Sequence, residues 1–285
     1  MTNNAKGLVI TSLGVFIMSL ESLFIKFTTI DSITFSFYLG IFMFISMAGT
    51  LLVKQRGEIK ELTKNSFPML LLCAALMGSS NILFITAIKS TTVANVVIIF
   101  GTSALFASLF GYLIYKEKIE KNILIASFFM LIGLFIIFSD DIGIGNMSGN
   151  IYALLCVCTF SLAFVFLSNY TKISRVGLTA VTGIYIAIIA FILSDNINID
   201  LNTLGIIAVM GLLITPISRV LMGNGTKYIS ASEVTLLMII ETIMAPVWVW
   251  LFLNEIPSSN TFIGGSIIVV TLIANSLYTL KKGNT

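Results

Sequence analysis

Ten long apolar stretches, separated by short polar or glycine-containing segments, make up most of the chain. Each is about 17–25 residues long, enough for a helix rising about 1.5 Å per residue to cross a hydrocarbon layer of roughly 30 Å. Uninterrupted apolar runs predict helices, because the strands of a membrane barrel would show shorter segments that alternate between apolar and polar residues. The predicted spans are 8–27, 32–53, 67–88, 92–115, 122–138, 150–169, 175–194, 203–226, 231–253 and 260–280.

The chain also repeats itself. The residues from Ala87 onward align without a gap with the residues that lie 138 positions later. Lys89, for example, aligns with Lys227. The matched pairs include the few polar positions, which chance agreement among Ile and Leu would not align: Thr92 with Ser230, Glu117 with Glu255 and Asn122 with Asn260. Two homologous halves follow, over residues 7–139 and 149–281. Because each half has five helices, an odd number, we predict an all-α integral membrane protein with ten transmembrane helices as two inverted five-helix repeats.

Positive charges are sorted between the two sides of the predicted bundle. Of 16 Lys and Arg residues, all but three lie at the N-terminus, in alternate loops or at the C-terminus; Lys26 and Lys89 fall on the other side and Arg219 lies within the membrane. The other side instead carries acidic residues, namely Asp31, Asp140, Asp141, Asp195, Asp200 and Glu255. The positive-inside rule then predicts a multi-pass protein whose N- and C-termini are both cytoplasmic.

Composition excludes a soluble protein. The chain is 57% hydrophobic and only 10% charged, contains no His, and has a mean hydropathy of +1.04, so a soluble surface cannot be built from it. Cys73, Cys156 and Cys158 all lie in predicted helices, and the last two point roughly 200° apart, which suits neither a metal nor a disulfide. No nucleotide-binding loop is present. We therefore expect a secondary transporter or facilitator without a cofactor, a metal or a nucleic-acid partner.

Short motifs in the second half carry a family resemblance. Ser230-Ala231-Ser232 opens a helix, Pro246 precedes Glu255 by nine residues, and Gly264-Gly265 lies in the closing helix. This pattern resembles the drug/metabolite transporter superfamily, in particular ten-helix members with two EamA-type domains. The first half departs from it, since Ser108 stands where Pro246 has its counterpart and Ala126-Ser127 replaces the glycine pair.

The resemblance implies ten helices in two inverted repeats, a location in the cell inner (plasma) membrane, and export or exchange of small metabolites. Amino acids, nucleosides, nucleotide-sugars and cationic drugs are the substrates found across such proteins. The motif is specific for the fold and does not identify a ligand.

Three charged residues fall inside predicted spans: Glu21, Arg219 and Glu241. Each costs about 2.5–3.5 kcal/mol at the centre of a membrane helix unless it is compensated, so they are candidates for function. Glu241 lies roughly 14 Å and Arg219 roughly 10 Å deep. They are candidates for an ion pair in a cavity that binds a charged substrate or a proton; alternatively, Arg219 reaches the headgroups and Glu241 neutralises it. Glu21 lies about 9 Å from the outer end of its helix, suited to the cavity mouth or to the interface near Lys26.

The internal repeat extends the candidate site. By the same offset, Arg219 corresponds to Asn81 and Glu241 corresponds to Ser103, so both halves carry polar residues at equivalent positions. We predict that Asn81 and Ser103 line one cavity, with hydrogen bonding between helices as the alternative for Asn81. Trp248 is a further candidate, because its ring would stack on an apolar ligand.

Other polar residues have structural explanations. Glu233 completes a capping-box pattern at a helix start. Glu117 and Glu255 are expected to act near the start of the next helix, and Pro216 and Pro246 are expected to bend their helices.

Two classes of function follow. The first is a secondary transporter, an exporter or exchanger of small metabolites such as amino acids, nucleosides or amphiphilic drugs, working by alternating access with protons as a candidate coupling ion through Glu241 and Glu21. The second is a flippase for a lipid-linked precursor or a non-transporting membrane scaffold. An enzyme is disfavoured, because no Ser/His, His/Glu or paired-Asp constellation lies at membrane depth. The expected partners are a small-molecule substrate and the lipid bilayer, and the oligomeric state is left open.

Overall fold

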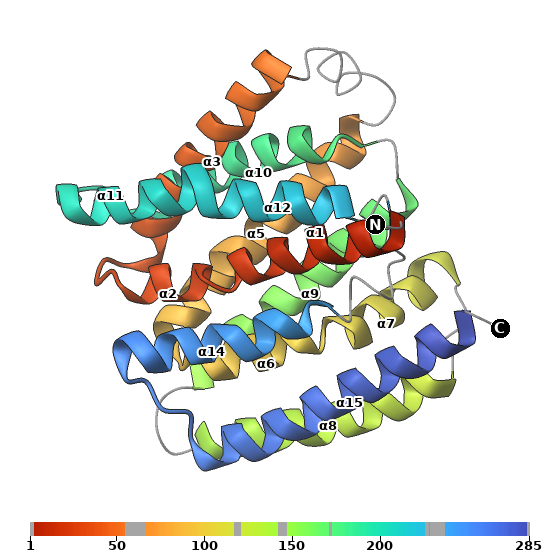
Figure 1. The fold of residues 1–285 in the computed structure, drawn as a ribbon. Coiled ribbons are helices and arrows are strands. Elements are labelled where there is room, and N and C mark those ends of the chain that lie inside the picture. Colours follow the sequence, from red (N-terminus) through yellow and green to blue (C-terminus); the bar gives the residue numbers. More distant parts are fainter. Residues whose placement is uncertain are drawn as a thin grey trace.

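The computed structural model describes residues 3–54, 67–116, 121–141, 147–170, 173–225, 228 and 237–283, and every regular element among them is a helix (Figure 1). Eight helical segments in this part of the chain are long and apolar enough to cross a membrane, and two shorter apolar helices follow them. The ten expected spans are therefore confirmed. The first half holds α1 (Asn3–Met18), α2 (Glu21–Lys26), α3 (Ser32–Lys54), α5 (Phe67–Ser90), α6 (Val93–Gly101), α7 (Ser103–Tyr115) and α8 (Lys121–Asp141). The second half holds α9 (Met147–Asn169), α10 (Arg175–Leu193), α11 (Leu201–Val209), η1 (Met210–Ile214), α12 (Thr215–Gly225), α14 (Ile239–Leu253) and α15 (Ser259–Gly283).

The helices pair as two equivalent halves should. The most extensive contacts join α3 with α10, α5 with α9, α8 with α15, and α1 with α12. A two-fold axis that exchanges the halves exchanges α3 with α10 and α8 with α15, so each of these two pairs is related to itself. The same axis exchanges α5 with α12 and α9 with α1, so the α5–α9 pair is equivalent to the α12–α1 pair. The two self-paired sets lie at opposite edges of the bundle (Figure 1). Five spans precede α9, so it crosses in the direction opposite to α1, and the repeats are inverted as predicted.

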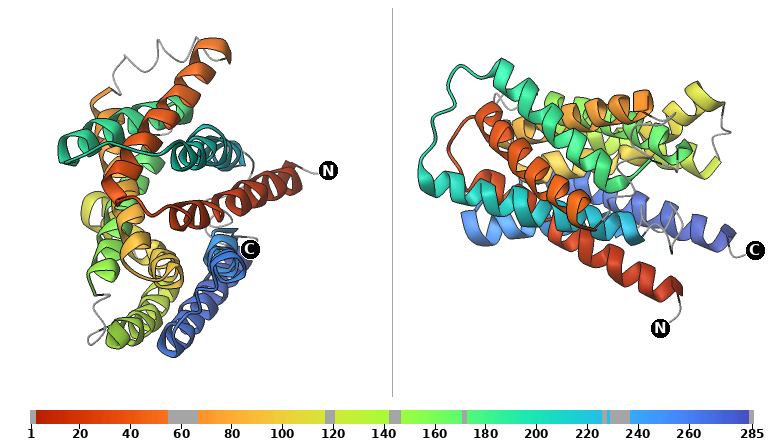
Figure 2. Two further views of the ribbon diagram at one scale, coloured as in Figure 1. Left: turned by 90° about the vertical axis from the view of Figure 1, so that its left-hand side faces the viewer. Right: turned by 90° about the horizontal axis from the view of Figure 1, so that it is seen from above.

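Both chain termini lie at one end of the bundle (Figure 2). We call this the terminal end. The opposite end carries the α2–α3, α10–α11 and α14–α15 connections, with Asp31, Asp200 and Glu255. Among the described residues, these acidic residues therefore lie at the end away from the termini.

Aspartates at the opposite end begin helices. Asp31 Oδ1 accepts hydrogen bonds from the backbone N–H groups of Ile33 at 2.9 Å and Thr34 at 2.8 Å, and Asp200 Oδ2 accepts one from Thr203 at 3.0 Å. Each bond satisfies a donor that the first helical turn leaves free. Partial burial raises the pKa of the Asp31 carboxyl, but the bonds from Thr34 and Ile33 outweigh it and hold the pKa below its usual value.

Glycines bring backbones together where the self-paired helices cross. A Cβ atom added at Gly40 would lie 2.7 Å from the carbonyl oxygen of Gly183, and one added at Gly133 would lie 2.7 Å from that of Gly264. In lipid, such close approach supplies the packing that holds helices together. The two halves therefore meet through positions where only glycine fits.

Several spans that the sequence predicted as continuous helices are interrupted. The first breaks at Ser19 and Leu20, between α1 and α2, the fourth breaks at Thr102, and α14 begins just after a turn at Met238. Ser19 Oγ donates to the carbonyl of Phe16 at 2.6 Å, and Thr102 Oγ1 donates to the carbonyl of Ile99, also at 2.6 Å. Such bonds compete with the backbone N–H for the carbonyl, which explains why the helices break at hydroxyl residues.

The eighth span contains a wider turn. The π-helical segment η1 lies directly before Thr215 and Pro216. Pro216 lacks the N–H that would bond to the carbonyl of Leu212, four residues earlier. Ser46 of α3 donates its hydroxyl to that carbonyl instead, at 2.9 Å. A side chain of one half thus compensates a defect in a helix of the other.

Candidate functional site

Two adjoining cavities lie between the halves at the level of the helix breaks. The central cavity has a volume of about 50 Å³, and the side cavity has a volume of about 100 Å³. Both are lined by Met238 and Glu241, among other residues. The polar lining of the central cavity comprises Glu21, Ser80, Asn81, Cys156, Arg219 and Glu241.

The three charged residues that the sequence singled out line this one cavity. Glu21 is the first residue of α2, Glu241 stands in the first turn of α14, and Arg219 comes from α12. Glu21 is 5% exposed and Glu241 is 6% exposed. Both carboxylates are thus buried in the first turn of a helix that follows a break in its span, where the helix dipole favours a negative charge.

Arg219 serves both carboxylates without a direct ion pair. Its positive charge acts on Glu21 and on Glu241, and the charge of Glu21 acts on Glu241. Among the described residues, Lys26 and Glu255 form an ion pair. No nitrogen of Arg219 lies within 4.0 Å of a carboxylate oxygen of Glu21 or Glu241. The direct Glu241–Arg219 ion pair considered from the sequence is thus absent from this conformation, and Arg219 lines the same cavity as both acids.

Buried oxygens in the site lack partners among the described residues. Oε1 of Glu21 and Oδ1 of Asn81 are buried without a close hydrogen bond, although the Thr215 hydroxyl lies near enough to the Glu21 carboxylate to interact with it. Glu21 and Asn81 line the central cavity, and Thr215 lies beside Glu21. A buried acceptor left unpaired costs about 1–3 kcal/mol, so these oxygens are ready to accept from a donor that enters the cavity.

Equivalent residues of the two repeats occupy these cavities. Asn81 lines the central cavity with its counterpart Arg219, and Ser103 lines the side cavity with its counterpart Glu241. The carbonyl oxygen of Ser103 accepts a hydrogen bond from Ser161 at 3.0 Å. The roles of Asn81 and Ser103 in ligand binding stay predictions.

Trp248 lies outside the lining of both cavities. Its indole Nε1 donates to Ser19 Oγ at 2.9 Å, and its ring packs edge-on against Phe16 at 5.7 Å between centroids. Trp248 therefore contacts α1 at the break that precedes Glu21. In this conformation it braces that break, and stacking on a ligand stays a prediction.

The apolar wall of the cavities escaped the sequence reasoning. Phe84 packs edge-on against Phe100 at 6.0 Å, and Phe100 packs against Phe160 at 4.8 Å. All three line the central cavity, together with the methionines Met18, Met77, Met222 and Met238. Rings and flexible thioethers suit an apolar ligand body of variable shape. No sequence signal separates these residues from lipid-facing ones, because both kinds are apolar.

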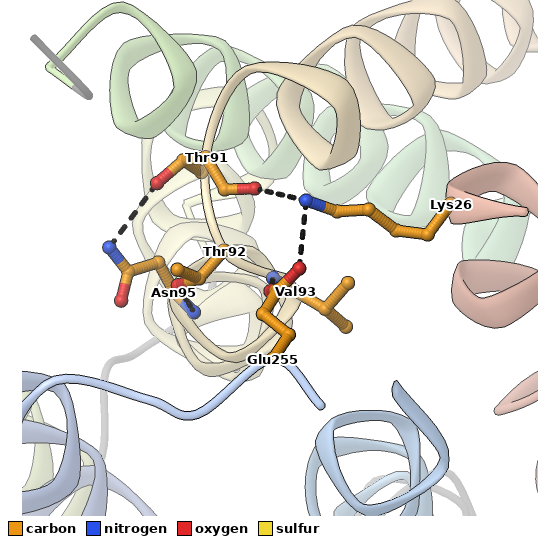
Figure 3. Close-up of polar contacts among 6 residues, drawn as sticks. All are labelled: Lys26, Thr91, Thr92, Val93, Asn95 and Glu255. Atoms are coloured by element: carbon orange, nitrogen blue, oxygen red, sulfur yellow. Dashed lines mark hydrogen bonds and ion pairs between the residues drawn. The ribbon is translucent and has the colours of Figure 1, made fainter. Parts of the chain in front are cut away.

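Glu255 has a structural role different from the expected one. Its Oε1 accepts from the backbone N–H of Val93 at 2.7 Å, and its Oε2 lies 3.0 Å from Nζ of Lys26 (Figure 3). It therefore caps α6, 162 residues earlier in the chain, and not the helix that follows it. Glu117 and Glu233 lie outside the described residues.

Known proteins resemble the chain over most of its length. Residues 5–139 and 147–277 match the EamA-like transporter family. A Clostridium kluyveri protein named as an uncharacterized transporter is 26% identical over 230 residues, 75% of this chain and 74% of that one. The Bacillus subtilis uncharacterized transporter YdfC is 28% identical over 176 residues, 59% of this chain and 57% of YdfC. A crystal structure with 12% identity, covering 99% of both chains, has a TM-score of 0.67 and so shares the fold.

Proposed function

Since the chain belongs to the EamA-like transporter family and is a multi-pass membrane transporter, we propose that it exports or exchanges a small metabolite by alternating access through the central cavity. The membrane is the cell inner (plasma) membrane, with the terminal end cytoplasmic. The single observation that supports this proposal best is the meeting of Glu21, Arg219 and Glu241 on one buried cavity between inverted repeats. Buried charges in membrane spans mark substrate or ion pathways.

The chemistry of the lining favours a small solute with both polar and apolar parts. Arg219 suits a carboxylate or another anionic group of the ligand, whereas Glu21 and Glu241 suit an ammonium group. The Phe and Met wall suits an apolar body. Amino acids, nucleosides and amphiphilic drugs each combine such groups. The two adjoining cavities, of about 50 and 100 Å³, are well below the roughly 300–1,000 Å³ of sites that hold drug-sized ligands, so a solute enters only when the halves move apart.

Charge balance supplies the candidate coupling. Two ionised carboxylates facing one guanidinium leave one negative charge uncompensated, which is costly in a buried site. Either a proton or the cationic group of a solute balances it. Solute and proton would then compete for Glu21 and Glu241, and this competition would tie the movement of one to the movement of the other.

A specific feature favours the alternative of a lipid-linked or amphiphilic substrate. An apolar groove of about 630 Å³ runs over the outer surface of α6, α14 and α15, and Thr242 lines both this groove and the side cavity. A flippase needs such a lateral route between the bilayer and a polar site. Movement of a labelled lipid-linked precursor across reconstituted vesicles would favour this alternative over a water-soluble solute.

Binding to the purified protein tests the proposal. Amino acids, nucleosides and cationic drugs are offered in turn, and the apparent melting temperature is read for the parent, for Glu241→Gln, and for Asp195→Asn as an exposed control. We expect one class to stabilise the parent and the control but not Glu241→Gln, whose own melting stays close to that of the parent. Equal stabilisation of all three proteins would show that Glu241 takes no part in binding.

A further inference from the structure

The six-residue helix α2 joins the charged site to the opposite end of the bundle. Its first residue, Glu21, lines the central cavity, and its last residue, Lys26, lies about 7.5 Å further along the helix. On the other side of Glu21, the chain is broken at Ser19 and Leu20. The helix α2 is thus a short unit with a helix break and a charged site at one end and a lysine at the other.

Among the described residues, the Lys26 ammonium has two polar partners, and both lie in other parts of the chain. Its Nζ lies 3.0 Å from Oε2 of Glu255 and donates to the carbonyl of Thr91 at 2.9 Å (Figure 3). Glu255 follows α14, and Thr91 precedes α6. Both α6 and α14 contribute to the central cavity, through Phe100 and Glu241. The lysine therefore ties together three cavity-lining elements at the opposite end.

The elements that receive Lys26 are themselves joined independently of it. Glu255 also accepts from the N–H of Val93, the first residue of α6. Deeper in the same end, Asn95 of α6 donates to Asn150 of α9 at 3.3 Å and accepts from Thr261 of α15. These bonds hold α6 to the second half whether or not Lys26 is in place, whereas Lys26 supplies the polar link from α2 to Glu255 and Thr91.

The strength of the Lys26–Glu255 pair suits a reversible contact. The two side chains are 21% and 23% exposed, so water can replace each partner when the pair opens. Partly exposed ion pairs contribute little free energy, and a contact of this kind can open and close within a transport cycle. A fully buried pair would resist rupture far more strongly.

We infer that α2 is the gate of the opposite end, latched shut by Lys26 against Glu255 and Thr91, and that Glu21 couples the latch to the occupancy of the cavity. This inference rests on the proposed alternating access. When a proton or a solute changes the attraction between Glu21 and Arg219, α2 turns about the Ser19–Leu20 break and withdraws Lys26. The cavity then opens between α2 and the joined α6 and α14.

A native cysteine reports the gate. Cys156 lines the central cavity, so with Cys73 and Cys158 changed to alanine it is the remaining thiol of the chain. A membrane-impermeant thiol reagent is applied separately to each face of sealed vesicles. The compared proteins carry Lys26→Gln, Glu255→Gln or Lys89→Gln in this background. Glutamine at 255 keeps an oxygen for the Val93 N–H and removes the charge that attracts Lys26.

Lys89 is the matched control. It lies at the same end, and its Nζ donates to the carbonyl of Thr28 at 2.9 Å, between α2 and α3, so its contact ties the end of α2 to α5 and does not involve α6 or α14. We expect Lys26→Gln and Glu255→Gln to raise the labelling rate from the opposite end by similar factors, roughly three-fold or more, and to lower it from the terminal end. Lys89→Gln should label like the parent.

Three results would overturn the inference. If the parent is labelled from both faces and Lys26→Gln and Glu255→Gln are labelled at the parent rate, the proposed role of Lys26 is wrong. Alternating access is then still supported. An equal rise in Lys89→Gln shows that the whole end has loosened. A parent that is labelled from neither face contradicts the proposed transport cycle itself. If Glu255→Gln fails to fold, Lys26→Gln decides alone.

Discussion

Ser103 and Glu241 occupy equivalent positions in the two repeats, and each stands just after a break in its span. Ser103 opens α7 after Thr102, and Glu241 lies in the first turn of α14 after Met238. The repeats therefore share a backbone feature, a helix start aimed at the cavities, but differ in charge. The second half supplies a carboxylate where the first supplies a hydroxyl. The two repeats therefore have equivalent helix starts but contribute different side-chain chemistry to the cavities.

Arg219 should be the residue on which the buried acids depend. Arg219→Gln leaves Glu21 and Glu241 without their positive neighbour, and we expect a loss of about 0.5–3 kcal/mol in the free energy of unfolding in detergent micelles. Adding Glu21→Gln to that variant should recover part of the loss, because it removes one of the stranded charges. A double-mutant cycle from chemical unfolding measures this coupling, and strict additivity of the two changes would contradict it.

The order of elements and their approximate bounds were readable from the sequence. The stretch predicted at 32–53 is helical over Ser32–Lys54, and that predicted at 175–194 is helical over Arg175–Leu193. Bilayer thickness imposes a length on each apolar run, which is why these predictions succeed. The offset that aligned Lys89 with Lys227 likewise implied inverted halves, because an odd number of crossings leaves no other arrangement.

Residues that depend on local or distant geometry could not be found in this way. The breaks at Ser19 and Thr102 lie inside stretches long enough to be single spans, and in the structure a hydroxyl bonding back to its own helix marks each of them. The cap of α6 by Glu255 joins residues 162 positions apart. Phe160 faces a cavity, whereas the exposed Phe128 does not line one, yet both read as apolar helix residues.

The crossing of α8 and α15 should tolerate no side chain at Gly133. A Cβ there would lie 2.6 Å from Ile268 Cγ1 and 2.7 Å from the backbone oxygen of Gly264, so we expect Gly133→Ala to cost about 1–3 kcal/mol of unfolding free energy. Gly49→Ala in α3 is the matched control. Nothing lies within 4 Å of its Cβ, and alanine should be neutral or stabilising by up to about 1 kcal/mol. Equal effects at the two positions would contradict the packing argument.

Ser46 should matter more than its neighbour Thr50. Ser46→Ala removes the hydroxyl that donates to the Leu212 carbonyl, the carbonyl that Pro216 cannot pair, at an expected cost of about 1–3 kcal/mol. The Thr50 hydroxyl donates to the Ser46 carbonyl within α3. This carbonyl also accepts a backbone hydrogen bond of its own helix, so Thr50→Ala does not leave it unpaired. Melting of the two variants side by side distinguishes them, and a Ser46→Ala protein as stable as Thr50→Ala would refute this account of the π-helical segment.

Asp31 should give a small, pH-dependent contribution to stability. Its folded-state pKa lies below the unfolded value, so the stabilisation is fully present above the unfolded pKa of about 3.9 and fades as the pH falls through the folded-state pKa. Asp31→Ala should lose about 0.5–2 kcal/mol near neutral pH through the lost helix cap. The gap between parent and variant should narrow in acid, whereas the exposed Asp195→Ala should match the parent throughout. A gap that stays constant down to acidic pH would show that ionisation of Asp31 is not involved.

Exchange across reconstituted vesicles tests the central claim most directly. Vesicles holding the purified protein are loaded with an unlabelled solute of the class found to bind, and entry of the labelled solute is followed for the parent and for Glu241→Gln. The account predicts rapid, saturable exchange by the parent and background entry for a folded Glu241→Gln protein. Exchange at the parent rate by Glu241→Gln, or none by the parent with any solute that binds it, would contradict transport through the cavity of Glu21, Arg219 and Glu241.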